Sequence, residues 1–354
     1  MVKYRRWCGV ALAVVAAIGV AGCGGGDSAR TDGDTTTVTV MTHDSWSAPD
    51  ALIAGFEAST GYKLRFQSSG DAGEVTNKVV LTKDAPVADV VYGIDNTFAT
   101  RAVDAGVLSA YVPGDLPASA AGFALEGDGA DRLTPIDYGD VCVNIDDAWF
   151  ADHGIAPPRS LDDLTKPAYR GLFVTPGAPT SSPGMAFLVA TVGAFGESGW
   201  QDYWRALMRN GTKITSGWSD AYGVDFTAGE GNGTRPIVLS YASSPPFTIP
   251  KGGSRPTTSA LLNTCFRQVE YAGVLEGSDN VAGAHAFIDF LVSREFQASL
   301  PENMYVFPVD DAVALPRLWE RFAKVAPSPI TVAPSTIAAR RDEWLKAWAD
   351  ITSG

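Results

Sequence analysis

Two stretches of the chain combine aromatic rings with hydroxyl and carboxylate side chains. The first covers residues 215–223 and contains Trp218 and Tyr222, and the second covers residues 239–245 and contains Tyr241. Flat rings stack on a flat ligand, while neighbouring hydroxyls and carboxylates fix its orientation through hydrogen bonds. This pattern predicts a binding site for a planar small molecule.

The N-terminal residues have the pattern of a secretory signal. Three basic residues precede an apolar run over residues 10–20, and Ala-Gly stands directly before Cys23. A helix needs about 20 apolar residues to cross a bilayer, so this run is too short for a membrane span. A basic segment, a short apolar core and small residues before the cleavage point are typical of a signal peptide, which we place at residues 1–22.

Cys23 is the expected site of lipidation. A cysteine directly after Ala-Gly resembles a lipobox, in which the cysteine is acylated and becomes the first residue of the mature protein. Residues 23–37 are then a flexible tether rich in Gly, Ser, Thr and Asp. The alternative is an ordinary secreted protein with a chance cysteine at this position. On the first interpretation the protein is extracytoplasmic and anchored to the cell membrane as a lipoprotein.

The charge of the chain excludes some classes of partner. Cleavage before Cys23 removes three basic residues and no acidic ones, so Lys plus Arg falls from 27 to 24 against 40 Asp plus Glu, and the net charge changes from −13 to −16. Nucleic acids and anionic lipid headgroups bind clustered Lys and Arg, so neither is an expected partner. An acidic surface is compatible with a cationic ligand and equally with simple solubility.

Two cysteines remain in the mature chain, Cys142 and Cys265, each in a strand-like run. In an oxidising compartment they could form a disulfide, or they could be two buried free thiols, and the sequence leaves both alternatives open. Two distant cysteines and three scattered histidines have no ligand spacing for zinc, so no metal site and no cofactor are expected.

The order of elements predicts an α/β protein. Removal of 22 of the 354 residues leaves 332, which suggests two domains. Strands and helices alternate, which is the pattern of a parallel sheet. The expected strands are 38–42, 63–67, 88–92, 171–175 and 237–241, and the expected helices are 48–60, 74–83, 97–105, 183–195, 200–209, 281–292, 294–300, 317–323 and 335–348. Candidate ligand residues follow several strands, where ligands bind in parallel sheets.

Several short motifs occur in an order and spacing that together resemble a known family. They are His43-Asp44-Ser45-Trp46, residues 88–96, Pro135-Ile136-Asp137-Tyr138-Gly139, Thr180-Ser181-Ser182-Pro183-Gly184 and Phe307-Pro308-Val309. From residue 38 to residue 348 the chain resembles the thiamine-binding, solute-capturing component of bacterial ABC importers.

The resemblance implies a two-lobed, type II periplasmic-binding-protein-like fold. Each lobe is a mixed sheet flanked by helices, and the ligand cleft lies between the lobes. Residues 38–137 and 270–354 would form lobe 1, with the option that the C-terminal helices pack across both lobes. Residues 138–269 would form lobe 2.

The resemblance also implies a set of aromatic ligand contacts. Trp218, Tyr222 and Tyr241 match aromatic positions of the family unchanged. Three further positions depart from the pattern but keep a flat ring: His43 and Phe247 stand where the family has Tyr, and Tyr305 stands where it has Trp. For Tyr222, Phe247 and Tyr305, ordinary hydrophobic packing is the alternative.

Polar ligand contacts follow from the same resemblance. Asp71 matches an acidic position that contacts the ligand, although it could instead cap the helix that follows. Ser181 and Ser182 open a helix whose free N–H groups suit a phosphate ester, or they form a plain N-cap. Asp44 and Trp46 complete the expected ligand set, although an Asp after a strand is often only a turn residue.

The resemblance implies a protein that captures thiamine or its phosphate esters and delivers them to an ABC permease and ATPase. No enzymatic activity is expected. One alternative is capture of ferric ion, a polyamine or a phosphonate by the same fold, but ferric capture wants adjacent tyrosines and Ala242 follows Tyr241. A remote alternative is an extracytoplasmic hydrolase that uses His43 and Asp44, but no Gly-x-Ser-x-Gly motif is present.

Replacement of Cys23 by Ala tests the lipidation hypothesis. Without the thiol that is acylated, the protein should stay unprocessed or leave the membrane fraction, which mass spectrometry and cell fractionation measure. An unchanged mature mass and location in the variant would contradict the hypothesis.

Overall fold

An eleven-stranded sheet organises residues 36–353, the part of the chain that the computed structural model describes. The predicted signal peptide, Cys23 and most of the predicted tether lie outside the described residues. The main strand order is β2-β1-β3-β10-β5-β8-β6-β7. The bounds are β1 Thr37–Thr42, β2 Lys63–Ser68, β3 Val90–Asp95, β5 Thr134–Asp146, β6 Phe173–Pro176, β7 Lys213–Thr215, β8 Ile237–Tyr241 and β10 Phe266–Leu275, with β4 Leu108–Ser109, β9 Thr258–Ala260 and β11 Phe307–Pro308 beside this path.

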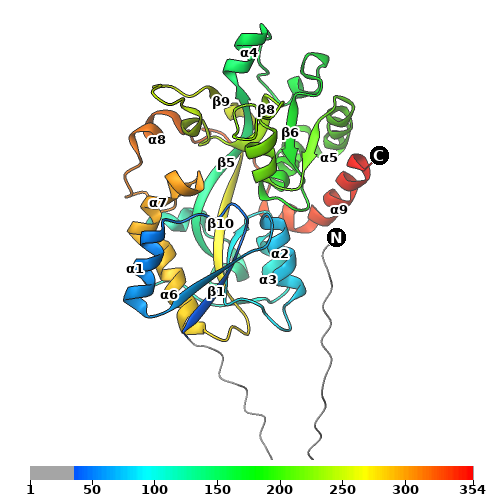
Figure 1. The fold of residues 1–354 in the computed structure, drawn as a ribbon. Helices are drawn as coiled ribbons and strands as arrows, with labels where there is room; N and C mark the ends of the chain where they lie inside the picture. Colours follow the sequence, from blue (N-terminus) through cyan, green and yellow to red (C-terminus); the bar gives the residue numbers. More distant parts are fainter. Residues whose placement is uncertain (1–35, 354) are drawn as a thin grey trace, which may run out of the picture. The chain divides into compact units, whose positions relative to one another are not determined.

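The sheet has two parallel halves joined by a long antiparallel pair. Strands β1, β2 and β3 form the first half, and β6, β7 and β8 form the second half. Between them β10 pairs with β5, and each of these strands also pairs with one half. Figure 1 shows β5 and β10 passing from one half to the other. The predicted α/β alternation is confirmed, and the predicted lobe boundaries at residues 137 and 269 fall within these two long strands, where they stay a prediction.

Nine α-helices are described within residues 36–353, and most of them flank the sheet (Figure 1). Helices α1, α2, α3 and α6 accompany the first half, and α5 accompanies the second. Helix α9 packs against α5, where Trp348 meets Trp204 edge to face at 5.5 Å. The bounds are α1 Asp50–Thr60, α2 Ala72–Leu81, α3 Ala99–Asp104, α4 Asp147–His153, α5 Ser182–Arg209, α6 Val281–Val292, α7 Arg294–Met304, α8 Arg317–Phe322 and α9 Pro334–Thr352.

Two local features differ from the sequence prediction. The two helices expected at 183–195 and 200–209 form the single element α5, which is interrupted at Gly196, where φ is 70° and ψ is 171°. Glycine adopts this conformation without a Cβ clash, so the chain kinks there and then resumes a helical path. Residues Ser219–Asp225, for which the sequence analysis assigned no helix, form a short π-helix directly after Trp218.

None of the helices described within residues 36–353 is long and apolar enough to span a membrane.

Cys142 on β5 and Cys265, directly before β10, form a disulfide in the structure. Their Cα atoms are 4.2 Å apart, and the register places Val141 opposite Phe266 next to them. The sequence left a bridge and two free thiols open. The fold brings the two residues together because β5 and β10 are paired antiparallel at this point, so the bridge fastens one end of the pair that joins the halves.

Replacement of both cysteines by Ala should lower the free energy of unfolding by about 2–5 kcal/mol, because the bridge closes a long loop with a sequence separation of 123 residues. Urea unfolding followed by circular dichroism measures the difference. Reductant should destabilise the wild type and leave the double variant unaffected. Equal unfolding free energies of the two proteins without reductant would contradict a stabilising bridge.

Candidate functional site

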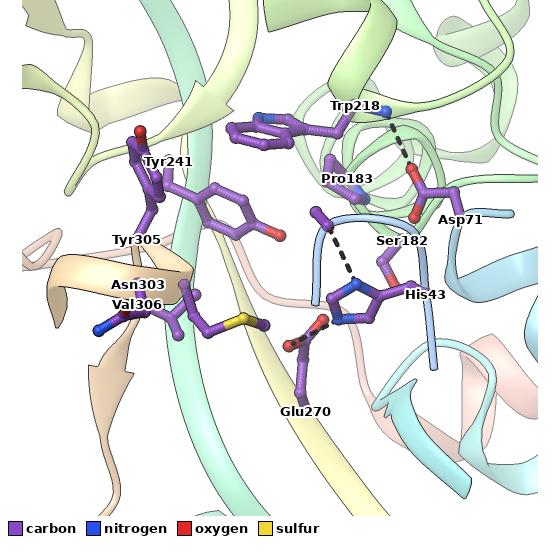
Figure 2. Close-up of a pocket in the computed structure, with 12 residues that line it drawn as sticks. His43, Asp71, Ser182, Pro183, Trp218, Tyr241, Glu270, Asn303, Tyr305 and Val306 are labelled. Carbon is purple, nitrogen blue, oxygen red and sulfur yellow. Dashed lines mark hydrogen bonds and ion pairs between the residues drawn. The ribbon is translucent and has the colours of Figure 1, made fainter. Parts of the chain in front are cut away.

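A narrow pocket lies where the two halves of the sheet face each other, and Figure 2 shows the residues that line it. The first half contributes His43, Ser45 and Asp71, and the second half contributes Trp218 and Tyr241. Glu270 on β10 forms the floor (Figure 2), and the remaining lining residues are Ser182, Pro183, Asn303, Met304, Tyr305 and Val306. The cavity volume is about 50 Å³. Pockets for drug-sized ligands measure about 300–1,000 Å³, so a ligand can enter only if the walls move apart.

The aromatic wall of the pocket is centred on Trp218. Its ring stacks on Tyr222, with centroids 5.0 Å apart and planes at 11°. Tyr305 meets it edge to face at 5.8 Å, and Tyr241 is tilted at 6.3 Å. The indole N–H of Trp218 donates to Ser240 Oγ at 2.9 Å, which fixes the orientation of the ring. Trp218, Tyr241 and Tyr305 line the pocket, and their contact with a ligand stays a prediction.

The Tyr241 ring sits on the backbone of β5. A Cβ atom added at Gly139 would lie 2.7 Å from Cδ1 of Tyr241, so only glycine leaves room for the ring at this point. Figure 2 shows the Tyr241 hydroxyl directed toward His43 and Glu270. The hydroxyl accepts a hydrogen bond from the Gln268 amide at 3.1 Å.

Several residues predicted to contact the ligand lie outside the pocket lining. Tyr222 supports Trp218 from behind, and Phe247 stacks on Tyr305 with centroids 3.4 Å apart. Trp46 packs among Phe66, Tyr92 and Phe296, next to the hydrophobic core. These three rings have the residue type of a stacking site but serve to position or pack against other rings.

Hydrogen bonds cross from the first half of the sheet to the second beside the pocket. The Trp218 N–H donates to Asp71 Oδ2 at 2.9 Å, and the Gly73 N–H donates to the Thr180 carbonyl at 2.9 Å. The Ser219 hydroxyl donates to Asp44 Oδ1 at 3.4 Å. Asp44 thus lies at the rim and outside the lining. These contacts hold the halves close together and must give way when a ligand enters.

Asp71 combines two roles that the sequence left as alternatives for a single residue. Its Oδ1 accepts from Ala72 N at 2.6 Å, and a capping box with Glu74 starts α2. Its other oxygen accepts from Trp218 and lines the pocket. Burial raises the pKa of Asp71, although the hydrogen bonds from Trp218 and Ser181 oppose the shift. Asp71 therefore connects the start of a helix to the aromatic wall.

The start of α5 forms the polar side of the pocket. Ser181 is the N-cap, and its Oγ accepts from Gly184 N at 3.4 Å. The Ser182 hydroxyl is buried, lines the pocket and has no hydrogen-bond partner among residues 36–353. A buried hydroxyl without a partner at the positive end of a long helix is suited to donate a hydrogen bond to an anionic group of a ligand.

Glu270 is the functional residue that the sequence analysis did not identify. It lies on β10, opposite Asp95 of β3 and Asp137 of β5. Its Oε2 is 3.6 Å from Nε2 of His43, and its Oε1 accepts from the Gln268 amide at 3.2 Å. Glu is almost never fully buried without a partner, so a Glu inside an apolar strand is the signal that could have identified it.

Tyr92 connects Glu270 to a second buried carboxyl group. Its hydroxyl donates to Asp137 Oδ2 and lies 3.3 Å from Glu270 Oε2. Burial raises the pKa of Asp137 well above its usual range, and the charge of Glu270 adds to the shift. Ionising two neighbouring buried carboxyl groups costs free energy, so Asp137 holds its proton to a higher pH than an exposed Asp does.

His43 and Glu270 form a buried pair of opposite charge. Burial by itself lowers the pKa of His43, but the Glu270 carboxylate, together with Asp71 and Asp44, makes the net shift upward. For Glu270, burial raises the pKa, but His43, together with hydrogen bonds from Asp137 and Tyr92, makes the net shift downward. The His43 ring packs on Gly93, where φ is 96° and an added Cβ would lie 2.3 Å from the ring. The pocket floor thus holds a charged pair in a fixed position.

No group of three His, Cys, Asp or Glu side chains that could hold a metal ion occurs within residues 36–353.

The chain is similar to proteins that capture solutes outside the cytoplasm. The family model described as bacterial extracellular solute-binding protein matches residues 44–298. The thiamine-binding periplasmic protein of Salmonella typhimurium is 29% identical over 319 residues, which cover 88% of this chain and 92% of that one.

Solved structures share the fold. A periplasmic thiamin binding protein aligns with a TM-score of 0.75 at 26% identity, covering 90% of this chain and 96% of that one. A ferric binding protein from Campylobacter jejuni aligns with a TM-score of 0.69 at 18% identity, covering 89% and 99%. The predicted two-lobed fold of periplasmic binding proteins is confirmed.

Asp95, buried beside Glu270, should make stability depend on pH. Burial raises its pKa from 3.8 to about 7, although hydrogen bonds from Thr97 oppose the shift. Because the folded state holds this proton more tightly than the unfolded state, the stabilisation is complete below about pH 4 and is lost as the pH rises through 7. The loss amounts to at most about 4 kcal/mol.

Urea unfolding between about pH 4 and about pH 8 measures this loss. Asp95→Asn should remove most of it, whereas Asp152→Asn, at an exposed position on α4, should follow the wild type. Parallel profiles for wild type and Asp95→Asn would show that Asp95 does not carry the effect.

Proposed function

The chain belongs to the family of bacterial extracellular solute-binding proteins, and we propose that it captures thiamine or a thiamine phosphate ester and delivers it to an ABC importer. The observation that carries the proposal is the pocket itself, which is lined by the Trp218, Tyr241 and Tyr305 rings and by the buried Glu270. The name of the Salmonella relative as a thiamine-binding protein supports the same ligand.

The chemistry of the pocket fits the cationic thiazolium of thiamine and the phosphate of its esters. A cationic thiazolium over an aromatic face gains about 0.5–2 kcal/mol, and Trp218 and its neighbouring rings offer such faces. Glu270 and Asp71 supply negative charge beside the rings. The Ser182 hydroxyl at the start of α5 is placed for the phosphate of an ester.

The proposal includes attachment to the membrane and partner proteins. Lipidation of Cys23 would anchor the protein at the outer side of the cell membrane, and an ABC permease with its ATPase would receive the ligand. The signal-like N-terminus supports this location.

A titration with three ligands tests the proposal directly. Free thiamine, its monophosphate and its diphosphate should each be added to the purified protein while the Trp fluorescence is followed, with calorimetry as an independent measurement. At least one should bind with a dissociation constant in the micromolar range or tighter. No response to any of them at millimolar concentration would refute the proposal.

Trp218→Ala should weaken binding by roughly 2–4 kcal/mol, because it removes the central ring of the aromatic wall. Trp218→Phe should keep a good part of the affinity, since a flat ring remains. Trp149→Ala provides the matched control, because Trp149 stacks on His153 on the distant helix α4 and should not affect binding.

Thermal unfolding of the ligand-free variants separates recognition from packing. If Trp218 acted only in packing, both of its variants would melt at lower temperature while the folded protein bound normally. That outcome would remove Trp218 from the binding site.

One arrangement raises a second candidate function, hydrolysis of the thiamine phosphate esters. The Ser45 hydroxyl is 2.9 Å from His43 Nδ1, and Glu270 lies on the other side of the same ring, which resembles a serine–histidine–acid set. Two features argue against this function. The His43–Glu270 distance of 3.6 Å is longer than a hydrogen-bond distance, and Ser45 lies only two residues from His43 in the chain. Assaying phosphate release from the thiamine esters separates the two functions, because a binding protein returns the esters intact.

A further inference from the structure

His43 is the only basic side chain among the described residues that line the pocket. Its partner Glu270 is also the carboxylate that a bound cation would approach. Both side chains are almost completely buried, with 5% and 6% of their surfaces exposed. A charge inside such a site interacts strongly with its neighbours, because little water is present to screen it.

Several acidic groups lie near His43. Asp44 follows it in the chain, Asp71 lies at the start of α2, and Glu270 is across the pocket on β10. Tyr92 and Asp95 on β3, Asp137 on β5 and Tyr241 on β8 surround Glu270. Within this group the single positive charge is the one that His43 carries when it is protonated.

We propose that the proton on His43 and the cation of the ligand compete for the Glu270 carboxylate, so that binding a cationic ligand releases a proton. In the empty pocket the protonated imidazole neutralises Glu270. When a thiazolium arrives beside Glu270, two positive charges face each other in a buried site, and the Nε2 proton of His43 leaves to solvent. The inference rests on the proposed function, because it requires a ligand that carries a positive charge.

The geometry of Nε2 supports this exchange. It is within ion-pair distance of Glu270 but makes no hydrogen bond within residues 36–353, whereas Nδ1 is held by Ser45. Loss of the Nε2 proton therefore breaks no hydrogen bond and leaves the ring in place. Gln268 and Tyr92 continue to position the Glu270 carboxylate for the incoming cation.

The expected effect is an affinity that increases with pH. If one proton leaves for each ligand bound, the dissociation constant falls by about tenfold per pH unit while His43 is protonated in the empty pocket. Above its raised pKa, His43 is already neutral and the dissociation constant becomes independent of pH. A ligand that leaves the protonation of His43 unchanged would show no such slope.

Calorimetry with free thiamine measures both quantities on the wild-type protein. Titrations from about pH 5.5 to about pH 8 yield the pH dependence. Repeating them in buffers with different ionisation enthalpies yields the number of protons released, and the expected number is close to one. Free thiamine is the appropriate probe, because the phosphate of an ester titrates with a pKa of about 6 and would obscure the result.

Variants assign the proton to His43. His43→Gln should bind with little pH dependence and release no proton, apart from the titration of thiamine itself, which all proteins share. Glu270→Gln should bind thiamine more weakly near pH 8 and lose the proton release. His153→Gln, exposed on α4, is the control and should behave as the wild type does.

The outcomes distinguish this inference from the proposed function. Thiamine binding without proton release, or with the same pH dependence in wild type and His43→Gln, would overturn the inference and leave the function intact. If a variant fails to fold, the proton count of the wild type decides alone. Failure of the wild type to bind thiamine at any pH would overturn the proposed function and the inference together.

Discussion

The antiparallel pairing of β5 with β10 is the interaction on which the rest of the structure depends. It is the connection between the two parallel halves of the sheet, since β10 also pairs with β3 and β5 also pairs with β8. The disulfide between Cys142 and Cys265 fastens one end of the pair. Farther along the same strands, Asp137 lies opposite Glu270 beneath the pocket. The strands that join the halves therefore also carry the charged residues at the floor of the site.

The buried charges at that floor restrict what the site can hold. Burying an isolated carboxylate costs free energy, and burying two adjacent carboxylates costs more free energy still. Asp137 accepts a hydrogen bond from Tyr92, and Glu270 pairs with His43. Burying apolar side chains at these positions would cost less free energy. The buried charged groups are therefore better explained by recognition of a charged ligand than by stabilisation of the fold. The aromatic wall gives the pocket a fixed shape, because one hydrogen bond holds the Trp218 indole and another holds its backbone.

How well the aromatic part of the site could be predicted depended on the direction of each side chain. Trp218, Tyr241 and Tyr305 were predicted as ligand contacts from the family resemblance, and they line the pocket. Trp46, Tyr222 and Phe247 were predicted in the same way but pack against other rings instead. Both groups are aromatic, and only the direction of each side chain distinguishes them. Glu270 was not predicted because it lies inside a strand, whereas candidate ligand residues were expected in the segments that follow strands.

The sequence alone determined the features that depend on neighbouring residues. Alternation of strand and helix patterns predicted the α/β fold, and the residue types near Asp71 and Ser181 predicted the helix starts that the structure contains. These features are set by periodicity and by hydrogen bonds over a few residues. The tertiary structure alone decided that His43 meets Glu270, that Asp71 holds Trp218 and that the two cysteines bond. Each of these contacts joins residues far apart in the chain, and their distance depends on strand register and on how the two halves approach, which no local pattern specifies.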